Sequence, residues 1–86
     1  MPALLIVHDV DDVDHWLKSP KRKELFGPRG FTVRTFVDPS DTHRVGLIVE
    51  GATLQDFEEL LRSEETQDAM KHDGVRAETV RVLEER

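Results

Sequence analysis

The middle of the chain reads FTVRTFVDPSDTHRVGLIVE, residues 31–50. Residues 31–37 alternate in polarity and are rich in β-branched and aromatic side chains, which predicts a strand. Residues 38–41 are Asp, Pro, Ser and Asp, all of which favour turns. Residues 43–50 predict a second strand, so that the whole stretch forms an antiparallel hairpin. The rest of the fold can be assigned outward from this hairpin.

A strand and helical turns are predicted before the hairpin. Residues 3–8 form an apolar run that ends in His8, which is too short for a helix and typical of a strand buried on both faces. The acids of residues 9–12 suit the start of a helix, because negative charge is favourable at the positive end of the helix dipole. Apolar residues at helical spacing within residues 13–17 continue this helix, and Pro20 interrupts it before a short second helical segment.

Two helices and a last strand are predicted after the hairpin. Thr53 is suited to cap the first helix, with Asp56 three residues later at the position of a near capping box. Ser63 begins the second helix and Gly74 ends it, because glycine readily adopts the left-handed conformation that terminates helices. Residues 75–83 then close the chain as a strand.

The order strand-helix-strand-strand-helix-strand divides the chain into two halves of similar length, residues 2–37 and 43–83. This order predicts an α+β fold of the ferredoxin-like βαββαβ type, a four-stranded antiparallel sheet with the helices on one face. With 86 residues the chain has room for one domain, residues 1–86. Residues 3–8 and 43–50 are apolar on both strand faces, and helices cover only one face, so we expect a homodimer that buries the other.

The composition argues against several classes of protein. The chain is 37% hydrophobic and 35% charged, with a net charge of −6 and a pI near 5.1, which argues against a nucleic-acid partner. No apolar run approaches the roughly 20 residues of a membrane span, so we expect no membrane insertion and a cytoplasmic location. The chain has no Cys, which excludes thiolate nucleophiles, disulfides and Cys-based zinc sites.

Positive charge is concentrated in residues 18–29, which contain five bases and one acid. Such a short run is typical of a solvated helix face and turn. The alternative is an electropositive rim that steers an anionic small molecule toward a pocket.

Several segments together resemble the dimeric α+β barrel superfamily. They are the strand and acidic helix start that lead to Trp16, the turn at Asp38-Pro39, the strand of residues 44–50 and the stretch MKHDGV of residues 70–75. That superfamily includes cofactor-free antibiotic-biosynthesis monooxygenases, haem-degrading enzymes, polyketide cyclases and muconolactone-isomerase-like proteins. The resemblance implies a homodimer whose two sheets pack face to face, with a small-molecule pocket in each subunit between sheet and helices.

The sequence departs from two branches of that superfamily. The quinone-forming monooxygenases and the haem degraders rely on an Asn together with a Trp, and this chain has Trp16 but no Asn. The cyclases and isomerases work with His, Asp or Tyr as acid/base groups, and Tyr is also missing here. His and carboxylate side chains therefore remain for the chemistry, and we expect no cofactor.

His8 is the residue that we expect to carry this chemistry. It follows an apolar run, on the strand face that Leu4 and Ile6 share, where one edge of a pocket would lie. With an ordinary pKa of about 6.5, an imidazole in a pocket can act as general base or general acid at neutral pH. The alternative is a strand-end histidine that only hydrogen-bonds a neighbouring carboxylate or loop carbonyl.

Four further residues are candidates for the lining of a ligand pocket: Trp16, Arg34, Phe36 and His72. Trp16 either belongs to the core or forms a wall that stacks on a flat ligand. Arg34 needs an anionic partner if its strand face is buried, either Glu50 or a ligand carboxylate. Phe36 is otherwise a core residue, and His72 is otherwise a cation that stabilises a helix C-terminus.

Residues 8–15 contain a dense run of His and Asp side chains, but we expect no metal site there and no structural metal anywhere in the chain. A metal ion needs ligands that converge, whereas a transition from strand to helix scatters the side chains. Helix capping and the helix dipole already explain the acids. No two histidines have the i,i+4 spacing that would place them on one helix face.

The sequence therefore favours a small dimeric protein that binds a small, largely apolar molecule. It is either a cofactor-free cyclase or isomerase with His8 as proton shuttle, or a non-catalytic module for ligand binding or protein interaction. A third version docks a regulatory partner through the acidic segments 56–59 and 64–65. A titratable group that faces a closed cavity would favour the enzyme over a passive pocket.

Overall fold

The chain forms four strands and a set of short helices in the computed structural model, which describes residues 3–86. Met1 and Pro2, with which the predicted domain begins, lie outside the described residues. Within residues 3–86, no helix has the length and apolar character needed to cross a membrane. The elements are, in chain order, β1 (Leu4–Val10), α1 (Val13–Lys18), α2 (Lys21–Phe26), the 3₁₀ helix η1 (Gly27–Arg29), β2 (Thr32–Val37), β3 (Arg44–Glu50), α3 (Leu54–Arg62), α4 (Glu64–Asp73) and β4 (Val75–Glu84).

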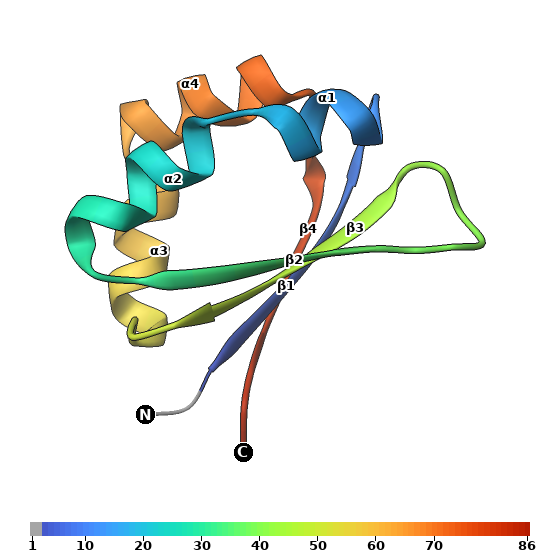
Figure 1. Ribbon diagram of the computed structural model, residues 1–86. Coiled ribbons are helices and arrows are strands. Elements are labelled where there is room, and N and C mark those ends of the chain that lie inside the picture. Colours follow the sequence, from blue (N-terminus) through green and yellow to red (C-terminus); the bar gives the residue numbers. More distant parts are fainter. Residues whose placement is uncertain (1–2) are drawn as a thin grey trace.

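The four strands form one antiparallel sheet in the order β2-β3-β1-β4 (Figure 1). β2 and β3 are the predicted hairpin, in which Val33 lies opposite Val49 and Val37 opposite Val45. β1 lies between β3 and β4, so that its backbone is paired on both sides. This arrangement confirms the α+β, ferredoxin-like fold that the order of elements predicts.

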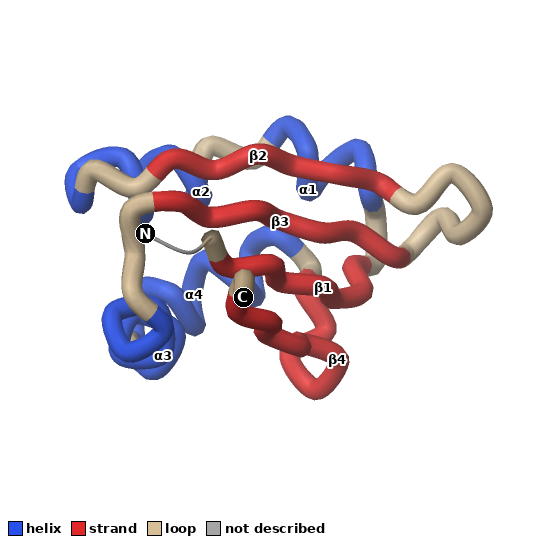
Figure 2. The backbone as a smooth tube through the Cα atoms, turned by 90° about the horizontal axis from the view of Figure 1, so that it is seen from below, coloured by secondary structure: helices blue, strands red, loops and turns tan. Residues whose placement is uncertain are grey.

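The helices lie on one face of the sheet. In Figure 1, α1, α2 and α4 lie above the strands and α3 lies beside the ends of β2 and β3, and in Figure 2, seen from below, no helix passes in front of the strands. The apolar core fills the space between the two layers, so a cavity in this core has strand residues on one side and helix residues on the other. The buried core residues include Leu4, Ile6, Val45, Leu47 and Val49 from the sheet and Trp16, Leu25, Phe26, Phe57, Leu60 and Ala69 from the helices.

β1 continues two residues beyond the predicted strand end at His8. Asp9 pairs with Arg44 of β3, and Val10 pairs with Val75 of β4, so the ladder runs on past His8. The prediction that His8 ends the strand is therefore wrong. His8 lies inside the sheet, beside an irregularity of the β1–β4 pairing that falls between Val7 and Asp9.

The predicted helix boundaries after the hairpin are present. Thr53 and Asp56 form a capping box: Thr53 Oγ1 accepts from the Asp56 amide at 3.0 Å, and the Asp56 carboxylate accepts from the Thr53 amide at 3.2 Å. Gly74 ends α4 with a φ of 71°, in the left-handed region that favours glycine. These local signals fix where α3 starts and where the chain turns from α4 into β4.

The uncovered face of the sheet carries apolar side chains from several strands. Leu5, Phe36 and Leu83 are 38%, 47% and 54% exposed, and they belong to β1, β2 and β4. Contiguous apolar patches on a protein surface commonly mark an interaction site. The cross-strand rows on this face are Arg34-Ile48-Leu5-Leu83 and Phe36-Gly46-Val7-Arg81.

Candidate functional site

His8 is buried between the sheet and the helices. It is 4% exposed, and neither of its ring nitrogens has a hydrogen-bond partner among residues 3–86. Trp16 of α1 packs against it edge to face, with ring centroids 5.6 Å apart and ring planes at 71°. The alternative of a hydrogen bond to a carboxylate or loop carbonyl is thus not realised in the described part of the chain. Buried polar groups in proteins are nearly always paired, so this histidine is unusual.

A cavity of about 70 Å³ lies next to His8. Its wall is largely apolar, with Ile6 and Leu47 on the sheet side and Trp16 and Phe57 on the helix side. His8 and Trp16, two of the predicted site residues, therefore meet at one cavity. The polar side chains on its wall are His8, Lys21, Arg22, Thr66 and Asp73.

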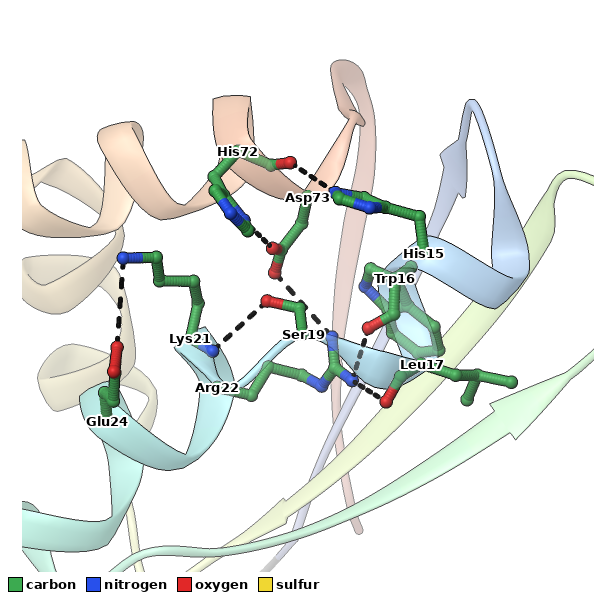
Figure 3. Close-up of polar contacts among 9 residues, drawn as sticks. All are labelled: His15, Trp16, Leu17, Ser19, Lys21, Arg22, Glu24, His72 and Asp73. Carbon is green, nitrogen blue, oxygen red and sulfur yellow. Dashed lines mark hydrogen bonds and ion pairs between the residues drawn. The ribbon is translucent and has the colours of Figure 1, made fainter.

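Arg22 of α2 brings a cation to this cavity (Figure 3). Its guanidinium carbon lies 4.1 Å from the centre of the Trp16 ring, and its Nη2 donates to the Trp16 carbonyl oxygen at 2.7 Å. Its Nη1 lies 3.8 Å from Asp73 Oδ2, beyond hydrogen-bond distance, and has no hydrogen-bond partner among the described residues. The Arg22 and Asp73 side chains are 14% and 5% exposed, so this ion pair is largely withdrawn from water.

The surroundings of His8 keep its imidazole neutral. The pKa of His8 is lowered from 6.5 to about 4. Burial is the main cause, the Arg22 cation acts in the same direction, and the Asp9 carboxylate opposes both. A neutral imidazole has one N–H donor and one lone pair. At neutral pH His8, which lines the cavity, therefore has one unused N–H donor and one unused lone pair.

His72 does not line this cavity; it lies at the C-terminal end of α4. Its side chain is 48% exposed, and its Nδ1 donates to Asp73 Oδ1 at 2.9 Å. His15 of α1 approaches from the other side, with its Nε2 2.7 Å from the His72 carbonyl oxygen (Figure 3). We call His15, His72 and Asp73 the polar cluster; only Asp73 connects it to Arg22 and the cavity.

Arg34 and Phe36 lie on the uncovered face of the sheet. Arg34 Nη2 lies 3.2 Å from Glu50 Oε1, the structural partner considered from the sequence, and both side chains are more than half exposed. Phe36 is 47% exposed and does not belong to the core. Because successive side chains of a strand point to opposite faces, these two residues face away from the cavity that His8 lines.

The fold has a solved counterpart. A crystal structure of an antibiotic biosynthesis monooxygenase superimposes with a TM-score of 0.62, over 100% of this chain and 97% of that chain. The two chains share one fold. Their sequences are 14% identical, so the similarity concerns the ferredoxin-like α+β fold alone. No protein-family model matches the sequence, and the search of curated proteins found no match.

Two residues of this site were not predicted from the sequence. Arg22 stands within the basic run of residues 18–29, which gives no sign that one base turns inward onto Trp16. Asp73 is the last residue of α4, directly before Gly74. An acid is unfavourable at the negative end of the helix dipole, and this unusual position is the one weak indication of a special role that the sequence offers. The packing of α2 against α4 is what brings the two together.

Proposed function

We propose that this chain binds a small, largely apolar molecule in the cavity beside His8, and that this molecule carries an oxygen that accepts hydrogen bonds. The observation behind the proposal is that His8 is buried with no partner for either ring nitrogen among residues 3–86. Leaving such a polar group unpaired costs about 1–3 kcal/mol of stability. A ligand that supplies the missing partner would account for that cost.

Arg22 supports the same class of ligand. Arg22 lines the cavity, and its Nη1 has an N–H without a hydrogen-bond partner among the described residues. Because a guanidinium stays protonated and only donates, it would bind an acceptor oxygen of a carbonyl, carboxylate or phenolate. The apolar wall around Trp16 suits the hydrocarbon part of the molecule. The ligand would then lie with its oxygen toward His8 and Arg22 and its apolar part against the helices.

For catalysis, we propose a cofactor-free isomerisation or cyclisation through an enolate. The lone pair of His8 takes a proton from the carbon next to a ligand carbonyl, and the C–H electron pair moves onto the carbonyl oxygen. The Arg22 N–H stabilises the negative oxygen that forms. His8 then returns the proton to another carbon of the same molecule, so an isomerisation gains and loses no atoms or electrons.

A non-catalytic ligand-binding protein is the second candidate function. It is favoured by the pKa of about 4 of His8, because such a weak base is poorly matched to proton abstraction at neutral pH. In the catalytic version, negative charge on the bound ligand has to raise the pKa of His8. The monooxygenase activity named for the similar structure is not part of either version, since this chain has no Asn to act with Trp16.

The cavity must widen to hold a ring-sized ligand. Its volume is about 70 Å³, whereas about 150 Å³ accommodates benzene in an engineered cavity. α1 and α2 have six residues each and are joined through Ser19 and Pro20. Helices this short depend on packing for their stability, so we expect ligand entry to displace them rather than the sheet.

We further propose that two copies pair through the uncovered sheet face to form a dimeric α+β barrel, with residues 1–86 as its single domain. Leu5, Phe36 and Leu83 are exposed in the single chain and would be buried between the two sheets. A stable interface commonly buries about 800 Å² on each partner. The cavity beside His8 lies on the opposite face of each sheet, so both cavities would remain open to ligand.

Binding can be tested with molecules that share a ring but differ in the oxygen they carry: benzene, phenol and benzoate. NMR signals of the His8 imidazole should shift with phenol and benzoate, and both should bind more tightly than benzene. Arg22→Met should weaken benzoate more than phenol, because the carboxylate is the stronger acceptor. Equal affinity for all three molecules, or binding that persists unchanged in His8→Leu, would contradict the proposal.

Exchange of α-protons distinguishes the two candidate functions. The probe is 4-oxocyclohexanecarboxylate, a ring ketone that carries the negative charge which the catalytic version requires. In deuterated water its α-protons should exchange faster with the wild-type chain than with His8→Leu if His8 is a catalytic base. Binding of this molecule without faster exchange would support the non-catalytic protein instead. Native mass spectrometry of freshly purified chain complements this test, since a retained natural ligand would be weighed directly.

A further inference from the structure

The polar cluster joins side chains that the sequence keeps far apart. His15 belongs to α1, whereas His72 and Asp73 stand at the end of α4, 57 residues further on. One ligand atom from each of the three side chains lies within 4.8 Å of the other two. The two imidazole rings are 5.4 Å apart between centroids and tilted by 35°. We propose that this cluster binds a Zn²⁺ ion through two imidazole nitrogens and one carboxylate oxygen, with water in the remaining position.

The donor set fits a first-row transition-metal ion. Imidazole is a preferred ligand of zinc, copper and nickel, whereas magnesium and calcium prefer oxygen ligands alone. Zinc binds His nitrogen and carboxylate oxygen at about 2.0–2.2 Å, so two ligands of one tetrahedral ion are about 3.3–3.6 Å apart. His72 Nδ1 and Asp73 Oδ1 are already 2.9 Å apart, and the widest separation within the cluster is under 4.8 Å. On zinc binding, the His72–Asp73 pair would open by about 0.5 Å and the widest separation would close by up to about 1.5 Å.

The structure combines one fixed ligand with two adjustable ones. Asp73 is 5% exposed and its other carboxylate oxygen faces Arg22, so its position is set by the interior. His15 and His72 are exposed and can rotate toward an ion. In the metal-free arrangement the His72 N–H donates to Asp73, and a bound ion would replace that proton.

The charges around the cluster act in opposite directions. Arg22 Nη1 lies 3.8 Å from Asp73 and disfavours a second cation nearby. On the exposed side, a hollow beside His72 carries more acids than bases, which attracts a cation. Asp68 lies one helical turn before His72 on α4, so its carboxylate faces the same side of the helix. The charged side chains that line this hollow are Lys21, Glu24, Glu65 and Asp68.

This proposal departs from the sequence-based expectation of no metal, which was argued from residues 8–15. The discounted run, residues 8–15, contributes only His15, and the other two ligands come from residues 72–73. The apolar core forms without the cluster, so the ion would stabilise the folded chain without being needed to form it. We therefore expect exchangeable binding that a chelator reverses and that leaves the chain folded.

The test measures Zn²⁺ binding by competition with a chromophoric chelator, on chain that carries no polyhistidine tag. The wild type should bind one Zn²⁺ per chain. His15→Gln and His72→Gln should each weaken binding by at least about ten-fold. His15→Gln keeps a side-chain N–H for the His72 carbonyl, so the helix contact is largely preserved. His43→Gln is the matched control, because His43 lies outside the cluster and should not change the affinity.

Two further readouts separate a true site from scattered surface binding. Co²⁺ in place of Zn²⁺ should give visible absorption bands that are lost in His72→Gln but kept in His43→Gln. Zn²⁺ should raise the melting temperature of the wild type, and Mg²⁺ at the same concentration should not. Equal Zn²⁺ affinity in all the variants, or the same stabilisation by Mg²⁺, would overturn the proposal. None of these outcomes depends on ligand binding in the cavity beside His8, so this inference and the proposed function fail separately.

Discussion

His8 and Trp16 meet edge to face, with ring centroids 5.6 Å apart, although one comes from a central strand and the other from the first helix. They are 4% and 1% exposed, so both rings lie in the interior. Both nitrogens of the imidazole nevertheless lack a hydrogen-bond partner in residues 3–86. The interior therefore encloses the His8 ring but leaves its hydrogen bonding unsatisfied, and a cavity of about 70 Å³ lies beside it.

His8→Leu should make the chain more stable at pH 7. Leucine is of similar size and has no polar atoms, so the cost of two unpaired nitrogens disappears, and we expect a gain of about 1–2 kcal/mol in the free energy of unfolding. Urea denaturation measures this gain. His43→Leu is the control, because His43 Nδ1 lies 3.0 Å from the Val10 carbonyl and its loss should bring no gain. A destabilised His8→Leu would mean that the imidazole makes a favourable contact.

The free energy of unfolding should decrease as the pH is lowered, because His8 is harder to protonate in the folded chain than in the unfolded chain. Its pKa is about 4 in the folded chain against 6.5 for the free side chain, so the unfolded chain takes up the proton first as the pH falls. The contribution of His8 to stability is fully present above about pH 6.5 and is lost progressively down to about pH 4, by up to about 3 kcal/mol in total. Carboxylates also titrate in this range, so the free energy of unfolding is measured by urea denaturation for both wild type and His8→Leu from pH 7 to pH 4. The difference between the two free energies at each pH then reports on His8. A difference that stays constant would show that His8 is not buried as a neutral group.

Asp73→Asn should destabilise the chain far more than Glu24→Gln. Both acids lie 3.8 Å from a base, but the Arg22–Asp73 side chains are 14% and 5% exposed, whereas those of Lys21–Glu24 are 39% and 57% exposed. Removing one charge of a buried pair leaves the other unpaired, so we expect Asp73→Asn to cost about 3 kcal/mol. Glu24→Gln should cost less than about 0.5 kcal/mol, because water screens exposed pairs. Thermal unfolding of both variants measures the contrast, and similar losses would contradict it.

Leu83→Lys should weaken the proposed dimer without unfolding the chain. Leu83 is 54% exposed on the uncovered sheet face, so a charge there meets water in the monomer and apolar surface in the dimer. Leu17→Lys is the control, because Leu17 is 43% exposed but belongs to α1 on the other side of the sheet. Sedimentation velocity should show a dimer for the wild type and Leu17→Lys, and a shift toward monomer for Leu83→Lys.

A wild-type chain that sediments as a monomer of 9.9 kDa would refute the dimer and leave the fold unaffected. Val80 and Val82 are unsuitable for this test. Val80 lines the cavity beside His8, and Val82 packs against the core, so a charge at either position would disturb the interior rather than the dimer face.

The sequence by itself determined the elements and their order. The hairpin of residues 31–50 follows from alternation and a four-residue turn, and the capping box of Thr53 and Asp56 from two residues three apart. Gly74 ends α4 because of its own backbone freedom. Each of these signals acts over a few residues, so it is present in the sequence before any long-range contact forms. The ferredoxin-like topology then follows from the order in which the elements occur.

The tertiary structure alone decided which side chains meet. The sequence correctly put His8 on the apolar strand face, but only the pairing of Asp9 and Val10 with neighbouring strands placed it inside the sheet. Arg22 turns inward because α2 packs beside α4, where Asp73 offers the opposite charge. The same packing of distant elements joins His15 to His72 and Asp73. Local patterns fix the backbone and the face to which a side chain points, whereas the partner on that face depends on elements tens of residues away.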